Sequence, residues 1–141
     1  MDYESAPAAA FGHSLTGLTV NLLCREVGRE AAFLQAVFGM QVHRLSRDFA
    51  ILVYGGRPFQ LHSDGSFSGH PLHALLPEAG PRGAGMELRL HESDPDAACT
   101  QAAAFADAMV LAEPRDKPAH GLREAVILSP AGYAWVPSRR I

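Results

Sequence analysis

Polar and apolar side chains alternate along three segments of the chain, near residues 19–21, 60–62 and 87–91. The polar members of these segments are Thr19, Asn21, Gln60, His62, Glu87, Arg89 and His91. Because successive side chains of a β-strand point to opposite faces, each segment would place its polar side chains on one face of a sheet. Such a face is a candidate site for binding a small molecule. The alternative is an ordinary solvated sheet face.

Two of these side chains could take part in a reaction. Glu87 is the candidate general base, since a carboxylate on a partly enclosed face can abstract a proton. Arg89 could oppose that role, and could instead anchor an anionic group through its planar guanidinium. The alternative is an exposed Glu87–Arg89 ion pair, which contributes little to stability. The sequence leaves these interpretations open.

The same segments carry nitrogen and oxygen atoms that could bind a metal ion. Gln60 and Glu87 alone would make a weak site for a hard cation, which prefers about six oxygen ligands. His62 and His91 could add nitrogen ligands, which suit zinc, iron, nickel or copper. The alternative is that both histidines are polar residues of a pocket or its rim.

Other residues that often carry chemistry show no recognisable motif. The only cysteines, Cys24 and Cys99, form no CxxC pair, so we interpret them as small apolar side chains and not as metal ligands or nucleophiles. His70 and His73 lie in a segment rich in glycine and proline, where a solvated loop is favoured over a lid. The chain has no GxSxG sequence, phosphate-binding loop or dinucleotide fingerprint.

The first half of the chain predicts one strand, one helix and three further strands. A stretch rich in β-forming residues at 16–23 precedes an amphipathic helix, which begins after Glu26 and ends at Gly39. The three strands that follow are expected at 41–46, 48–54 and 58–62. Residues 1–15 are expected to form an N-terminal tail or a short packed arm.

The second half repeats this order of elements. A strand at 86–90 is followed by a helix, for which Asp94 is the expected N-cap and which continues to about Ala108. Three strands are then expected at 110–112, 123–128 and 133–136. When Thr19 is aligned with Glu87, the apolar positions of the two halves coincide, which indicates an internal repeat.

The repeat predicts a single α+β domain over residues 16–137. Module one covers 16–62, module two covers 85–137, and each has a strand-helix-three-strand (βαβββ) order. The connecting linker, 63–84, is too long for a hairpin turn. Leu72, Leu75 and Leu76 predict that part of this linker packs against the modules.

Composition excludes several classes of protein. The chain has 141 residues, 48% of them hydrophobic, with a net charge of −3. Lys117 is its only lysine, so a protein that reads the nucleic-acid backbone is not expected. No apolar run approaches the roughly 20 residues of a membrane span. We therefore expect a cytoplasmic protein with neither nucleic acid nor membrane as a partner.

Three stretches of the sequence resemble the vicinal oxygen chelate superfamily, which includes glyoxalases, bleomycin-resistance proteins and extradiol dioxygenases. The first is LTVNL at 18–22, leading into FGM at 38–40. The second is ELRL at 87–90. The third and most specific comprises GLREA at 121–125 and SPAGY at 129–133, although Ser129 and Ala131 replace the usual aspartates.

The resemblance implies a curved mixed sheet whose concave face binds the ligand, and a homodimer. It places on that face Thr19, Asn21, Gln60, His62, Glu87, Arg89, His91 and Val136. Metal-dependent members of the superfamily use four of these positions, which here hold Thr19, Gln60, Glu87 and Val136. Because valine has no ligand atom and threonine is a poor ligand, the resemblance implies that the metal site has been lost.

The expected function is therefore that of a small-molecule-binding protein of the glyoxalase/bleomycin-resistance type, without a metal. The first alternative is a divergent lyase, isomerase or dioxygenase with a displaced metal held by Gln60, His62 and Glu87, with or without His91. The second alternative is a cofactor-free enzyme in which Glu87 is the general base.

Overall fold

The computed structural model describes all 141 residues and contains the expected repeat. Module one consists of β1 (Asn21–Cys24), α2 (Val27–Phe38), β2 (Gln41–His43), β3 (Phe49–Tyr54) and β4 (Arg57–Ser63). Module two consists of β5 (Glu87–Leu90), α3 (Pro95–Ala102), β6 (Met109–Lys117), β7 (Leu122–Leu128) and β8 (Ala134–Arg140). The prediction of two βαβββ modules in an α+β fold is confirmed. No helix is both long and apolar enough to cross a membrane.

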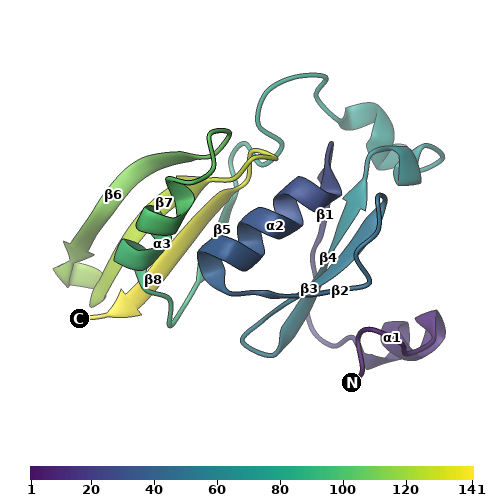
Figure 1. Cartoon of the computed structure of the whole chain (residues 1–141), viewed down its shortest axis with the longest axis horizontal. Helices are drawn as coiled ribbons and strands as arrows, with labels where there is room; N and C mark the ends of the chain where they lie inside the picture. The colour runs from purple at the N-terminus through teal and green to yellow at the C-terminus, as the bar shows by residue number, and fades with distance from the viewer.

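Each module forms its own four-stranded mixed sheet. The strand orders are β1-β4-β3-β2 and β5-β8-β7-β6, so the first strand of each module lies parallel to its last strand. Helices α2 and α3 lie side by side on the same side of the two sheets (Figure 1). Both sheets remain open, and β1 and β5 each have one edge without a strand partner.

One hydrophobic core joins the two modules. The side of α2 that faces the sheets carries Val27, Ala31 and Leu34, each almost fully buried, as the helical spacing predicts. The Phe33 ring packs edge to face against Phe105 of module two, with 5.3 Å between centroids. Because residues of both modules belong to this core, neither module buries its own apolar face independently.

The ends of the two helices follow the expected signals, except at one end. Gly39 ends α2 with a φ of 67°, and the Asp94 carboxylate caps α3 by accepting the backbone N–H groups of Asp96 and Ala97. The prediction that the second helix continues to about Ala108 is wrong, since α3 ends at Ala102. The residues beyond it form turns, where tertiary contacts to module one override helix propensity.

Two strands of module two differ in length from the prediction. β6 runs to Lys117 and not to 112, with irregular pairing on both sides of Ala112. β8 runs to Arg140 and not to 136. Both extensions are polar, and pairing with β7 supplies the backbone hydrogen bonds that hold them.

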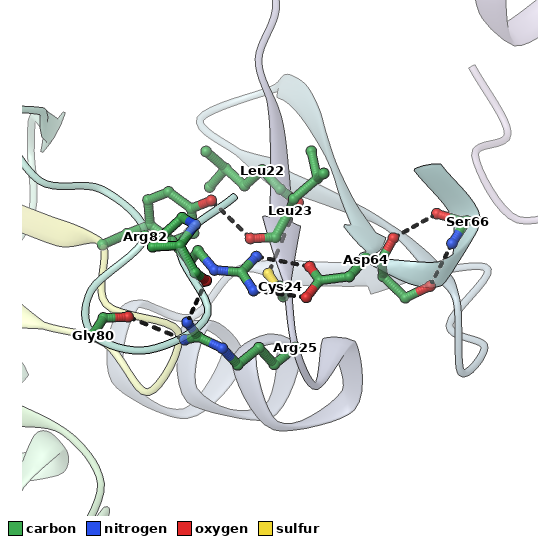
Figure 2. A network of polar contacts seen from close by, with 11 residues as sticks. Leu22, Leu23, Cys24, Arg25, Asp64, Ser66, Gly80 and Arg82 are labelled. Atoms are coloured by element: carbon green, nitrogen blue, oxygen red, sulfur yellow. Dashed lines mark hydrogen bonds and ion pairs between the residues drawn. The ribbon is translucent and has the colours of Figure 1, made fainter. Parts of the chain in front are cut away.

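The linker is held by arginines and not by the leucines that the sequence indicated. Leu75 is 77% exposed, so the expectation that this leucine packs is wrong. Arg25 donates hydrogen bonds to the carbonyls of Pro77 and Gly80, and Arg82 forms a bidentate ion pair with Asp64 at 2.6 and 2.7 Å (Figure 2). The guanidinium of Arg82 is only 3% exposed, and it fastens the linker to the end of β4.

Of the two alternatives for residues 1–15, the structure has the packed arm. Its helix, α1 (Ala8–Ser14), places Phe11 against Ile51 and Val53 of β3, on the face opposite α2. The Glu4 carboxylate accepts the backbone N–H of Arg44 at 2.9 Å. The arm therefore covers part of the sheet face of module one that lies opposite α2.

Candidate functional site

Strand register places the polar side chains as their alternation predicts. Asn21 pairs with Gln60, and in module two Glu87 pairs with Ala134 and Arg89 with Val136. Directly paired residues share a face, so these side chains lie on the faces of the two sheets opposite α2 and α3. The structure gathers them into two separate clusters, one in each module.

The module-one cluster is centred on His62. Its Nε2 lies 3.1 Å from the Gln60 Oε1, and its ring is flanked by Phe49 and Phe67, with centroids 5.2 and 5.0 Å away. Partial burial lowers the pKa of His62 below its ordinary value of 6.5. This arrangement favours the neutral imidazole, which accepts or donates hydrogen bonds without carrying a charge.

The module-two cluster is centred on Arg89. Its guanidinium lies 2.5 Å from a Glu124 carboxylate oxygen and 3.4 Å from a Glu87 oxygen. The hydrogen bond from Arg89 lowers the pKa of Glu124, and Lys117 adds to this effect from 3.6 Å. Glu124 was not among the predicted site residues, although it stands in the GLREA stretch that carries the family resemblance. Glu87 is exposed and paired, as in the ion-pair alternative.

Three other predicted residues are His91, Val136 and Thr19. The His91 Nδ1 lies 3.3 Å from the hydroxyl of the buried Ser138. Val136 is fully buried in the sheet, so it offers no surface to a ligand. Thr19 is exposed and lies just before β1.

The residues at the four positions that hold the metal in the superfamily do not fit a metal ion. Val136 has no ligand atom, and Thr19 supplies only a neutral hydroxyl. No hydrogen bond or ion pair joins the Gln60–His62 pair to Glu87, and no three His, Cys, Asp or Glu side chains converge to hold an ion. The displaced site with Gln60, His62 and Glu87 would draw its ligands from two separate clusters.

A groove runs between the free edges of β1 and β5 and has a volume of about 250 Å³. We call it the inter-module groove. Its apolar walls come from both modules and include Leu18, Val20, Leu22, Phe59, Leu88 and Trp135. Its polar lining includes Thr19 and Arg89, which the alternation predicted, and Tyr54 and Arg57, which it did not.

Two contacts hold the walls of this groove in place. The Tyr54 hydroxyl donates to the His91 carbonyl at 2.6 Å and so ties β3 to the end of β5. The rings of Phe59 and Trp135 pack with 5.8 Å between centroids and join β4 to β8. Arg57 follows Gly55 and Gly56, whose φ values of 55° and 76° form the tight hairpin turn between β3 and β4.

A second and larger pocket, of about 490 Å³, lies between the end of α2 and the start of α3. His91 is the only predicted binding residue that lines it. Its lining is mostly polar, and Asp94 there already accepts backbone N–H groups of its own helix. The inter-module groove has the apolar lining with few polar groups that is typical of small-molecule sites.

His70 and the two cysteines lie outside these clusters and have structural roles. The His70 Nδ1 accepts the backbone N–H of Leu72 and caps a short turn, so His70 acts within the linker. Burial raises the pKa of both thiols, that of Cys99 to about 11. Neither cysteine therefore forms a thiolate readily, in agreement with their interpretation as small apolar side chains.

Sequence reasoning also missed Glu30, a fully buried carboxylate in α2. It accepts hydrogen bonds from the Ser129 hydroxyl at 2.6 Å and the Ala131 backbone N–H at 3.0 Å, so it joins module one to the last turn of module two. The signal was present in the sequence, because Glu30 stands three residues after Val27 on the apolar stripe of the helix.

Comparison with solved structures identifies proteins with the same architecture. A glyoxalase/bleomycin resistance protein/dioxygenase family enzyme from Burkholderia phytofirmans superposes with a TM-score of 0.72 at 21% identity, over 87% of this chain and 97% of its own. A glyoxalase-related enzyme from Fulvimarina pelagi gives 0.69 at 14% identity, over 89% and 88%. A lactoylglutathione lyase from Agrobacterium tumefaciens gives 0.61 at 18% identity, over 88% and 92%.

No protein-family model matches the sequence, and no curated protein matches it. At these identities the structural likeness concerns the fold and not the ligand. The chain therefore has the same two-module fold as these glyoxalase-related proteins.

Proposed function

We propose that this chain is a small-molecule-binding protein that works without a metal, and that its ligand occupies the inter-module groove. The observation that carries the proposal is the groove itself, in which apolar side chains of both modules surround a few polar groups. Such a lining matches the composition of small-molecule sites. The lost ligand atoms at Thr19 and Val136 support the metal-independent part.

Trp135 provides a direct test, because it is the only tryptophan and it lines the groove. A library of small organic molecules is screened for quenching of its fluorescence and for an increase in melting temperature, since a ligand that binds only the folded state raises it. Hits are then measured on two variants. Leu18→Ser changes a side chain that lines the groove yet is 94% exposed, so folding should be unaffected.

Leu45→Ser is the matched control, because Leu45 is also exposed but does not line the groove. We expect Leu18→Ser to weaken binding by several-fold and Leu45→Ser to leave it unchanged. The same melting experiment is run with Mn, Fe, Ni and Zn ions, and we expect no shift. One metal per chain, bound with a clear shift that Glu87→Ala removes, would contradict the proposal and favour the metal-dependent alternative.

The proposal includes a homodimer, as the resemblance implies, and a cytoplasmic location. The dimer is supported by exposed apolar side chains on the edge strand β6, namely Met109 and Leu111.

A further inference from the structure

The charged residues of the inter-module groove all carry the same sign. Arg57 and Arg89 are the only charged side chains among those that line it, and no carboxylate does so. The adjoining hollow, between the groove and the N-terminal arm, is also lined by Arg57 and by no acidic residue. This concentration of positive charge is local, because the whole chain has a net charge of −3.

The two arginines differ in how their charge is balanced. Arg89 is neutralised by Glu124 at 2.5 Å and by Glu87 at 3.4 Å, so its guanidinium has partners within the protein. The Arg57 guanidinium has neither an ion pair nor a hydrogen bond, although most other arginines of the chain do. Arg57 is therefore the group of the groove that is free to pair with a ligand.

The position of Arg57 is fixed by its backbone. Arg57 pairs with Tyr54 across the tight Gly55-Gly56 turn, at the start of β4. The apolar surfaces of Phe59 and Trp135 lie in the same groove. A ligand that satisfies both features needs an apolar ring or chain and, beside it, a group with negative charge. A guanidinium recognises carboxylate, sulfonate and phosphate groups through paired hydrogen bonds.

We infer that the inter-module groove binds an amphipathic organic anion, whose apolar part contacts Trp135 and Phe59 and whose carboxylate, sulfonate or phosphate pairs with Arg57. This inference rests on the proposed function and narrows its ligand class. A cationic ligand of the same shape is disfavoured, because it would meet the unpaired guanidinium of Arg57, while no carboxylate lines the groove.

A pair of fluorescent probes separates the two parts of the inference. The anion 1-anilinonaphthalene-8-sulfonate and the uncharged N-phenyl-1-naphthylamine share the same aromatic body and differ by one sulfonate. Binding of each is followed through quenching of Trp135, which reports occupancy of the groove. The variants are Arg57→Gln and, as the matched control, Arg47→Gln, since Arg47 is also exposed, has no ion pair and lies outside the groove.

We expect the anion to bind wild type at least tenfold more tightly than the uncharged probe. Arg57→Gln should weaken binding of the anion by about tenfold, the range for a hydrogen bond to a charged group, and change binding of the uncharged probe less than twofold. Arg47→Gln should leave both unchanged. Added salt should weaken the anion only, because it screens an exposed charge.

The outcomes that overturn the inference differ from those that overturn the proposed function. If both probes quench Trp135 with similar affinities, and Arg57→Gln affects neither, the groove binds apolar molecules and the charge inference fails. The same holds if Arg47→Gln weakens the anion as much as Arg57→Gln does. If neither probe quenches Trp135, the inference about the anion fails. If no compound of the library quenches it either, the groove is not a binding site and the proposed function fails as well.

Discussion

At the scale of single residues, the ionisation of Glu30 depends on the fold. Burial raises the pKa of its carboxyl above the usual 4.5, although hydrogen bonds from Ser129 and Ala131 lower it in part. The buried indole N–H of Trp135 has no hydrogen-bond partner within range and acts on the same carboxylate from further away. The folded protein therefore holds this proton more tightly than the unfolded chain does.

The contribution of Glu30 to the free energy of unfolding therefore depends on pH. Because the pKa of Glu30 is raised in the folded protein, its protonated carboxyl contributes its full stabilisation below pH 4.5. This contribution is lost as the pH rises through the folded pKa. Glu30→Gln cannot ionise, so its free energy of unfolding should improve relative to wild type as the pH rises. Urea unfolding at a series of pH values between 4.5 and about 8 measures this difference.

Glu113→Gln is the control, since Glu113 is exposed and forms no ion pair. Its unfolding free energy should follow that of wild type at every pH. Parallel pH profiles for Glu30→Gln and wild type would show that Glu30 does not titrate in this range.

The residues of the candidate site show what local sequence can and cannot predict. Alternation alone placed Gln60, His62 and Arg89 on the correct faces, because the period of a strand is fixed by its backbone. It did not indicate that Glu124 would pair with Arg89, or that Arg57 would line the groove. The Arg89–Glu124 pair depends on strand order, and the groove beside Arg57 depends on how the two modules meet, and both bring together residues far apart in the sequence.

At the scale of elements, the turn before β8 depends on one glycine. Gly132 has a φ of 89°, and a Cβ there would lie 2.4 Å from the Pro81 Cα and 2.8 Å from the Arg82 backbone N. These atoms belong to backbone that Arg82 holds in place through Asp64. The turn therefore requires a residue without a side chain, both for its conformation and for the approach of the linker.

Gly132→Ala should lower the free energy of unfolding by about 2 kcal/mol or more, from the strained φ and the clash together. Gly28→Ala is the opposite case, because Gly28 lies in α2 and a Cβ there meets no atom within 4 Å. It should stabilise the protein by up to about 1 kcal/mol through helix propensity. Thermal and urea unfolding of both variants measure the two signs, and equal effects would contradict the role given to Gly132.

The elements themselves were predictable where a local signal was strong. Gly39 and Asp94 marked helix ends that the structure confirms, because caps act within one turn of the backbone. The end of α3 was missed, since Phe105 and Asp107 look helical in sequence but are drawn out of the helix. Phe105 packs against Phe33, and Asp107 forms a bidentate ion pair with Arg29 of module one.

At the scale of the whole molecule, the proposed homodimer concerns the outer edge of module two. β6 is an edge strand, and its Leu111 side chain is 52% exposed. An edge strand with exposed apolar side chains and unpaired backbone groups favours association with a second copy. The expected particle mass is twice the 15.1 kDa of the chain, measured by sedimentation equilibrium.

Leu111→Lys should shift this equilibrium toward the monomer, because a charge on the edge strand opposes association. Leu75→Lys, in the exposed linker, is the matched control and should leave the mass unchanged. A monomeric wild type, or a dimer that Leu111→Lys does not weaken, would contradict a dimer through β6.

The relation between the two modules was the least predictable feature. The repeat in the sequence indicated two similar halves, but not that their clusters of polar side chains would stay apart. That outcome follows from the shared core and from cross-module contacts, such as those of Tyr133 with the Leu23 carbonyl and of Ser129 with Glu30. Such contacts join positions that no short window of sequence contains.

The parallel pairing of first and last strands also determines how the chain can fold during its synthesis. β1 remains without its partner until β4 has emerged from the ribosome, and β5 remains so until β8 has emerged. Glu30 is translated early, but its hydrogen bond to Ser129 forms only after module two has been translated. The core that α2 helps to form is likewise incomplete until Trp135 has been translated. Nearly the entire chain is therefore translated before the shared core can form. Until then, the growing chain would expose apolar surface to chaperones.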